Sequence, residues 1–142
     1  MEKENRMNKK GLQRCKYLDK LGIPIEEYGT NFCNKKDKRW KRWMKQRKKY
    51  GFDDRETWNL DQSFYEWIYT RFTMYKKVTN ADLSRNTIKL NNGEEISLGE
   101  AIDIVIKGFK KSLLENDWIS DNNDPPHEVW EVLEKVMPHM WW

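Results

Sequence analysis

Apolar residues recur at helical spacing in several stretches of the chain, and residues that start or end helices separate these stretches. Residues 11–21 have apolar positions three apart and predict a short first helix that ends at Gly22. Residues 37–50 predict a second helix, which begins at a capping Asp37 and stops at Gly51. The apolar stripe of this second helix consists of Trp40, Trp43 and Met44.

A third helix is predicted over residues 60–77, with Asn59 as its cap and large apolar side chains on two faces. The expected core face consists of Leu60, Phe64, Trp67, Ile68, Phe72 and Tyr75. Tyr65 and Tyr69 lie on the flank of the same helix. Their rings are either exposed at a recognition site or half-buried, since tyrosine suits both positions.

A β-hairpin is predicted over residues 87–97. A three-residue loop ending in a left-handed Gly93 puts Ile88 and Ile96 on one face, whereas a two-residue loop would separate them. Ser97 and Glu100 then form a capping box that opens a fourth helix. This is the expected core helix, and its apolar positions are Ile102, Val105, Ile106, Phe109 and Leu113.

A fifth helix is expected to begin with Asp124 as its cap and Pro125 at its first position, and to end at Pro138. Its apolar positions are Val129, Trp130, Leu133, Val136 and Met137. The sequence thus predicts a mainly α fold of about five helices with one small β-hairpin. We expect a flexible N-terminus over residues 1–9 and a single helical domain over residues 10–142.

Composition supports a folded protein in spite of 35% charged residues, because 13% of the residues are aromatic and eight of them are Trp. No apolar run approaches the ~20 residues that span a bilayer, and the first residues do not resemble a signal peptide. We therefore expect a cytoplasmic protein without a membrane partner. Cys15 and Cys33 are expected to be reduced thiols, although a disulfide is not excluded.

The charge is distributed unevenly along the chain. Residues 1–50 hold 17 Lys or Arg and 6 Asp or Glu, a net charge of +11, whereas the remaining residues carry a net charge of −7. Such asymmetry indicates an anionic partner for the first half, or docking of the basic half on the acidic half of the same chain. The densest segment is 35–49, where ten of fifteen residues are Lys or Arg.

Catalytic motifs are absent from the sequence, so we expect no enzyme activity, no cofactor and no metal site. The two histidines, His127 and His139, have no Cys or carboxylate cluster at zinc-ligand spacing. Asp53, Asp54 and Glu56 could bind Mg²⁺, but helix capping explains them more simply.

Arginines and aromatic residues are the candidate ligand-binding groups, because guanidinium groups hold phosphates and rings stack on bases. Trp40 and Trp43 are interleaved with arginines but have the spacing of core residues. Trp141 and Trp142 could fold back on the core or form a docking tag. The predicted ligand-binding residues are Arg39, Arg42, Arg55, Trp58, Asp61, Tyr65, Tyr69 and Arg71.

The segment YGFDDRETWNLD, residues 50–61, followed by FYEWIY, residues 64–69, resembles a motif of an uncharacterised family of short phage and prophage proteins. The resemblance implies a phage origin and a location in the host cell cytoplasm, and it assigns no residue a role. By analogy with small phage proteins that block host defences, we expect an anti-defence sponge. It would bind a nucleotide or cyclic oligonucleotide signal without turning it over.

Two alternatives stay open at this point. The helix over 35–49 could bind DNA or RNA, or the protein could inhibit a host defence factor through a protein–protein contact. The oligomeric state is also open, and a homo-oligomer is compatible with the sequence.

Overall fold

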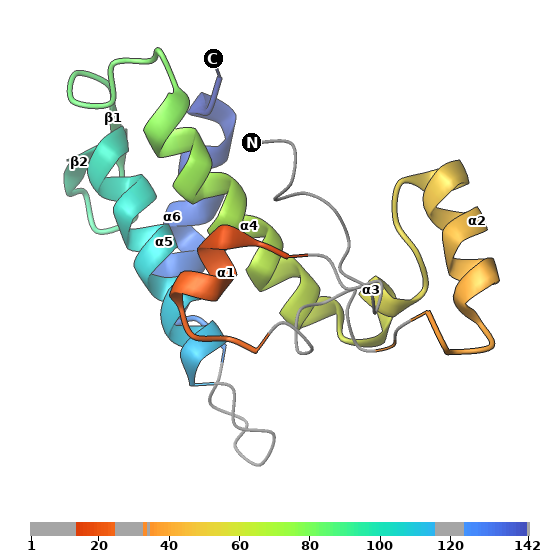
Figure 1. Cartoon of the computed structure of the whole chain (residues 1–142). Coiled ribbons are helices and arrows are strands. Elements are labelled where there is room, and N and C mark those ends of the chain that lie inside the picture. The colour runs from red at the N-terminus through yellow and green to blue at the C-terminus, as the bar shows by residue number, and fades with distance from the viewer. Residues whose placement is uncertain (1–13, 25–32, 34, 116–123, 142) are drawn as a thin grey trace. The chain divides into compact units, whose positions relative to one another are not determined.

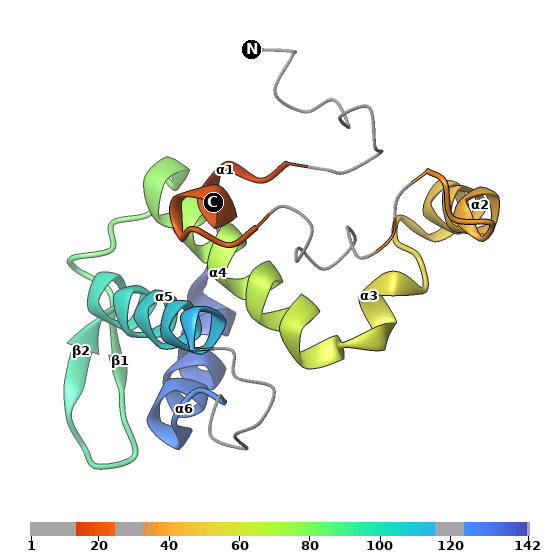
Figure 2. The same ribbon diagram turned by 60° about the horizontal axis from the view of Figure 1, so that its bottom comes forward.

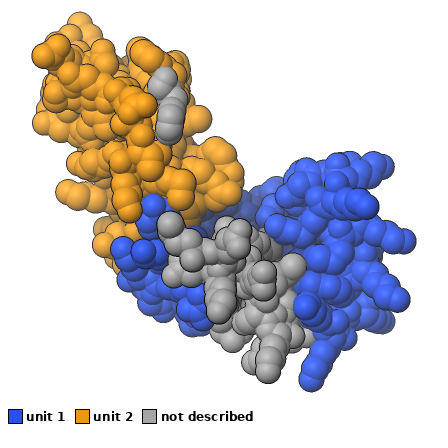
Figure 3. All heavy atoms as spheres, turned by 45° about the horizontal axis from the view of Figure 1, so that its top comes forward, with its two compact units in different colours: residues 1–66 blue, residues 67–142 orange. Residues whose placement is uncertain are grey.

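The computed structural model describes residues 14–24, 33, 35–115 and 124–141. This part of the chain is mainly helical, with helices α1 to α6 and one two-stranded antiparallel hairpin, which confirms the predicted fold class (Figure 1). The chain forms two compact units, residues 1–66 and 67–142, coloured separately in Figure 3. The predicted flexible segment 1–9 and Trp142 lie outside the described residues.

The first unit contains α1 (Lys16–Lys20), α2 (Trp40–Tyr50), α3 (Arg55–Trp58) and the first turns of α4 (Leu60–Val78). The described part of the first predicted helix is thus a short segment, followed by Gly22 with a positive φ of 76°. After Gly51 the chain forms the short helix α3, in agreement with the expected capping role of Asp53 before it.

Helix α2 begins three residues later than Asp37, so the predicted start is wrong. Asp37 instead heads a turn, in which its side chain accepts a hydrogen bond from the Arg39 backbone N–H and its carbonyl accepts one from Trp40. The predicted end is confirmed, because Gly51 adopts a left-handed φ of 83° and donates its N–H to the Arg47 carbonyl. Trp43 is fully buried, whereas Trp40 and Met44 are half-buried.

Helix α4 buries only part of the predicted core face, namely Ile68 and Phe72. Leu60, Phe64 and Trp67 are exposed, and the buried positions are Tyr65, Glu66, Ile68, Tyr69, Thr70 and Phe72. Large apolar side chains occur at helical spacing on both sides of this helix, so periodicity alone could not decide between them. Tyr75 is half-buried, and its hydroxyl donates to the Trp141 carbonyl at 2.8 Å.

The second unit contains the hairpin of β1 (Thr87–Lys89) and β2 (Glu95–Ser97), followed directly by α5 (Leu98–Leu114) (Figure 2). Ile88 pairs with Ile96 and both are buried, and Gly93 has a φ of 88°, so the three-residue loop is confirmed. The Ser97 hydroxyl accepts a hydrogen bond from the Glu100 N–H, as the capping box predicts.

Helix α6 (His127–Val136) packs against α5 and completes the core of this unit. The two helices approach closely at Gly108, where an added Cβ would lie 2.6 Å from a methyl carbon of Val129. Ile106 is only half-buried, in contrast to its predicted core role. Buried residues of α5 and α6 include Ile102, Val105, Phe109, Leu113, Val129, Val132, Leu133 and Val136.

The predicted ends of α6 need correction. Pro126, not Asp124, occupies the N-cap position, so the helix starts two residues later than expected. The chain continues past Val136 as a 3₁₀ turn over Met137–His139, with Pro138 within it. Trp130 and Met137 are exposed rather than buried, although the Trp130 ring meets Phe109 edge-on with centroids 5.4 Å apart.

Candidate functional site

The basic helix α2 separates its cations by type. Arg47 on α2 and Arg39 just before it flank the buried side, close to Trp43, and Arg42 lies between that side and the lysines. Lysines occupy the opposite arc, where every one of them is exposed. The two sets have different surroundings, and these surroundings decide which cations can meet an external anion.

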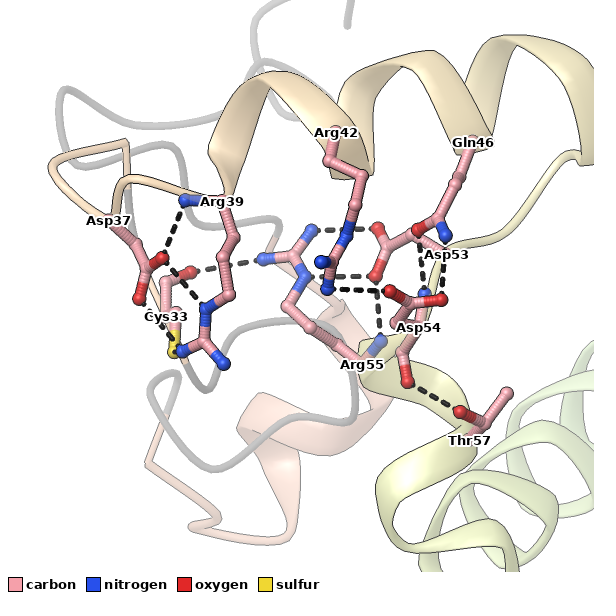
Figure 4. Close-up of polar contacts among 9 residues, drawn as sticks. All are labelled: Cys33, Asp37, Arg39, Arg42, Gln46, Asp53, Asp54, Arg55 and Thr57. Carbon is pink, nitrogen blue, oxygen red and sulfur yellow. Dashed lines mark hydrogen bonds and ion pairs between the residues drawn. The ribbon is translucent and has the colours of Figure 1, made fainter.

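A buried ion pair lies beneath α2. The Arg55 guanidinium donates to both carboxylate oxygens of Asp53, at 3.0 and 2.9 Å, and also to the Cys33 carbonyl at 3.0 Å (Figure 4). Asp53 and Arg55 are 1% and 2% exposed. The guanidinium carbon of Arg55 lies over the Trp43 ring, 4.6 Å from its centre, so a cation–π contact supports the pair.

The Asp53 carboxylate also orders the start of α3. It accepts the Arg55 backbone N–H at 3.0 Å, and Arg47 of α2 approaches the same carboxylate at 3.3 Å. Burial disfavours the charged form, but the hydrogen bonds from the Arg55 side chain and backbone outweigh it and lower the pKa of Asp53. Asp53 is therefore a structural anion that joins α2 to α3.

Asp54 forms a second link between α3 and α2. Its carboxylate contacts Arg42 at 2.8 Å and accepts a hydrogen bond from the Gln46 amide at 2.6 Å. The Asp54 backbone N–H donates to the Gln46 side-chain oxygen in return. Because the Arg42 side chain is more than half exposed, its ion pair with Asp54 contributes little to stability.

Arg39 bridges an acidic turn and two tryptophans. Its guanidinium donates twice to Asp37, at 3.0 Å each, and those hydrogen bonds hold the pKa of Asp37 well below its usual range. The guanidinium carbon lies 5.0 Å from the centre of the Trp43 ring and 5.2 Å from that of Trp58. The Arg39 guanidinium also approaches the Cys33 sulfur. The pKa of the Cys33 thiol is raised, mainly because the thiol is partly buried.

The structure therefore brings Arg39, Arg55 and Trp58 together around Trp43. Trp58 is 43% exposed and meets Trp43 edge-on, with ring centroids 5.7 Å apart. Arg55 is buried, so the prediction that it holds an external phosphate conflicts with its position. Cys15 and Cys33 are free thiols, which agrees with the expected reduced state.

The other predicted ligand-binding residues lie on α4. Tyr65 and Tyr69 are buried, which decides against the exposed recognition site, one of the two alternatives that the sequence left open. Asp61 is exposed in the first turn. Arg71 is exposed, donates to the Thr70 hydroxyl at 2.9 Å and lies over the Trp67 ring.

The lysines of α2 were the part of the site that the predicted residue set missed. We define the lysine face as Lys41, Lys45, Lys48 and Lys49 of α2 together with Lys38 in the turn before it. All five are exposed, and none forms an ion pair with a carboxylate in the described part of the chain. The signal that could have found them is a helical projection of residues 38–50, which separates these lysines from the arginines by their angle around the helix axis.

The described residues include no group of three or more His, Cys, Asp or Glu side chains that could hold a metal ion. Asp53 and Asp54, considered above as Mg²⁺ ligands, are engaged by arginine side chains. Among these residues no helix combines the length and apolar character that crossing a membrane requires.

Comparisons with protein-family models, with curated proteins and with solved structures find no match for this chain. The resemblance of residues 50–69 to short phage proteins therefore stays a prediction, and the function has to be argued from the residues themselves.

Proposed function

We propose that this protein binds the phosphate backbone of a nucleic acid along the lysine face of α2. The observation that carries the proposal is that, among the described residues, the arginines of this segment are paired with carboxylates and the lysines of the lysine face are not. Arg39, Arg42 and Arg47 are neutralised by nearby carboxylates, whereas the lysine face carries five exposed charges without an ion pair in the described part of the chain. Clustered lysines of this kind repel one another, and a polyanion relieves that repulsion.

The length of the lysine face suits a repeating anion. Lys41 and Lys49 are eight residues apart, which corresponds to roughly 12 Å along a helix at 1.5 Å per residue. Because each strand of B-DNA carries one phosphate for about every 3.4 Å of the helix axis, more than one phosphate fits beside this length. The lysine ammonium group is a flexible point charge and lacks the planar, bidentate donor geometry of arginine. We therefore expect contacts with the phosphate backbone and no recognition of bases.

Sequestration of a small nucleotide signal is the second candidate. The exposed Trp58 ring lies beside the partly exposed Arg39 guanidinium, and such a pair could stack on a base and contact a phosphate. Against this, Arg39 would have to leave Asp37, and Arg42 would have to leave Asp54. An anti-defence role and a cytoplasmic location in an infected cell are compatible with either candidate.

Neutralising three lysines should separate these candidates. In the variant Lys41→Gln/Lys45→Gln/Lys48→Gln we expect binding of a fluorescently labelled 30-nucleotide single strand to weaken by at least about tenfold at low salt, because three phosphate contacts are lost. Fluorescence anisotropy measures the affinity. Binding of a di- or trinucleotide should be weak in the wild type and should change little in the variant.

The matched control is Lys107→Gln/Lys110→Gln/Lys111→Gln on α5. It removes the same charge from three exposed lysines that do not belong to the lysine face, so it should leave the affinity within about threefold. An equal loss of affinity in both variants would show that net charge, and not the lysine face, determines binding. Tight binding of a cyclic oligonucleotide that depends on Arg39 and Trp58 would favour the sponge instead.

A further inference from the structure

Helix α4 exposes a row of large side chains that the function proposed above does not use. Leu60, Phe64, Trp67, Arg71, Met74 and Val78 are all exposed, and Leu60 and Met74 are 66% and 53% exposed. Their spacing alternates between four and three residues along one continuous helix. At 100° per residue they fall within about 80° of one another around the helix axis, so they form a single seam.

This spacing is the heptad pattern of a helix that pairs with another helix. Apolar residues alternating three and four apart occupy the a and d positions of a coiled coil. The far side of α4 already carries its buried residues, among them Ile68 and Phe72. The seam is therefore a second apolar face, with Leu60, Trp67, Met74 and Val78 as its main members.

We propose that the seam binds α4 of a second copy of this chain in an antiparallel pair. The row is symmetric about position 69, so an antiparallel copy brings Leu60 against Val78 of the copy and Trp67 against Arg71 of the copy. One surface therefore serves both partners, as a two-fold symmetric dimer requires. Each of the two central contacts would be an arginine over a tryptophan, which is already the arrangement of Arg71 and Trp67 within one chain.

Charge favours the antiparallel orientation over the parallel one. The first turn of α4 carries Asp61, and its last turn carries Lys77 besides Lys76, which pairs with Asp103 of the same chain. Antiparallel pairing places the acidic end beside the basic end of the copy and opposes the two helix dipoles favourably. Parallel pairing in register would place Arg71 beside Arg71 of the copy, where the two like charges would repel each other and both would be desolvated.

Sedimentation equilibrium of the full chain tests the proposal. A single helix pair is a small interface, so we expect a weak dimer of twice 17.4 kDa that forms within about 1–500 µM. Met74→Glu places a charge in the seam and should raise the dimer dissociation constant by more than about tenfold. Leu114→Glu is the control, because Leu114 is 51% exposed and lies on α5.

Circular dichroism and thermal unfolding check that both variants fold. If Met74→Glu does not fold, Val78→Glu takes its place as the seam variant. A monomer at every concentration, or a dimer that Met74→Glu and Val78→Glu leave unchanged, would overturn the proposal. Orientation is tested with Leu60→Cys and Val78→Cys chains in which Cys15 and Cys33 are replaced by Ser. Antiparallel pairing predicts an oxidised dimer from the mixture, whereas a dimer from Leu60→Cys chains alone would contradict it.

Discussion

Arg55→Ala is expected to lower the free energy of unfolding of the first unit by about 3–5 kcal/mol, the usual effect of removing one partner of a buried ion pair. The substitution leaves the Asp53 carboxylate buried without its two-pronged partner, and it removes the cation over Trp43. It also leaves the Cys33 carbonyl without the Arg55 donor. Because Asp53 joins α2 to α3, both helices should lose protection together.

Hydrogen exchange of the α2 and α3 amides measures this loss locally and does not require the whole chain to unfold in one step. Asp53→Leu/Arg55→Met is the matched control, since replacing both charges by apolar groups of similar volume avoids an unpaired buried charge and should cost much less. Equal losses in the single and double variants would show that the size of the side chains, not their pairing, stabilises this cluster.

The same carboxylate predicts an acid dependence. The pKa of Asp53 is lower in the folded protein than the ~3.9 of an unfolded chain, so its contribution is fully present above that value. The contribution is lost as the pH falls through the lowered pKa. Denaturation between pH 7 and pH 2.5 should show wild-type stability falling below about pH 4. The fall should be shallower in Asp53→Asn, and parallel curves would contradict the assignment.

Phe109→Ala is expected to cost about 3–5 kcal/mol in the second unit, the range for removing a buried aromatic side chain. Phe109 is fully buried between α5 and α6 and supports the Trp130 ring. Chemical denaturation measures the loss, with Leu114→Ala as an exposed control on the same helix that should change stability by less than about 0.5 kcal/mol. A Phe109→Ala effect as small as the control would place α5 outside the core.

Local sequence signals predicted the second unit well. The loop Asn91–Gly93 determined the register that pairs Ile88 with Ile96, and Ser97 marked the N-cap of α5, which begins at Leu98. These features depend on neighbours within a few residues, which a sequence displays directly. The start of α6 was missed because two consecutive prolines each fit the first turn, and only the fold selects Pro126 as the cap.

Long-range burial was harder to predict, and the candidate site shows why. Tyr65 and Tyr69 are buried while Leu60 and Trp67 are exposed, a choice that depends on which other elements cover α4. The arginines were predicted as ligand-binding groups from charge alone, yet Arg39 and Arg55 find Asp37 and Asp53 only two residues away. Lysine and arginine contribute equally to a net charge. A charge count therefore could not predict that they occupy different sides of α2, which only helical geometry shows.

The salt dependence of nucleic-acid binding tests the central claim most directly. If the lysine face neutralises about four phosphates of a single strand, the logarithm of the binding constant should fall against the logarithm of salt concentration with a slope of about −3. Lys41→Gln/Lys45→Gln/Lys48→Gln should bring that slope close to −1, since each lost contact removes about 0.7. A wild-type slope near zero, or the same slope in this variant, would contradict backbone binding by the lysine face.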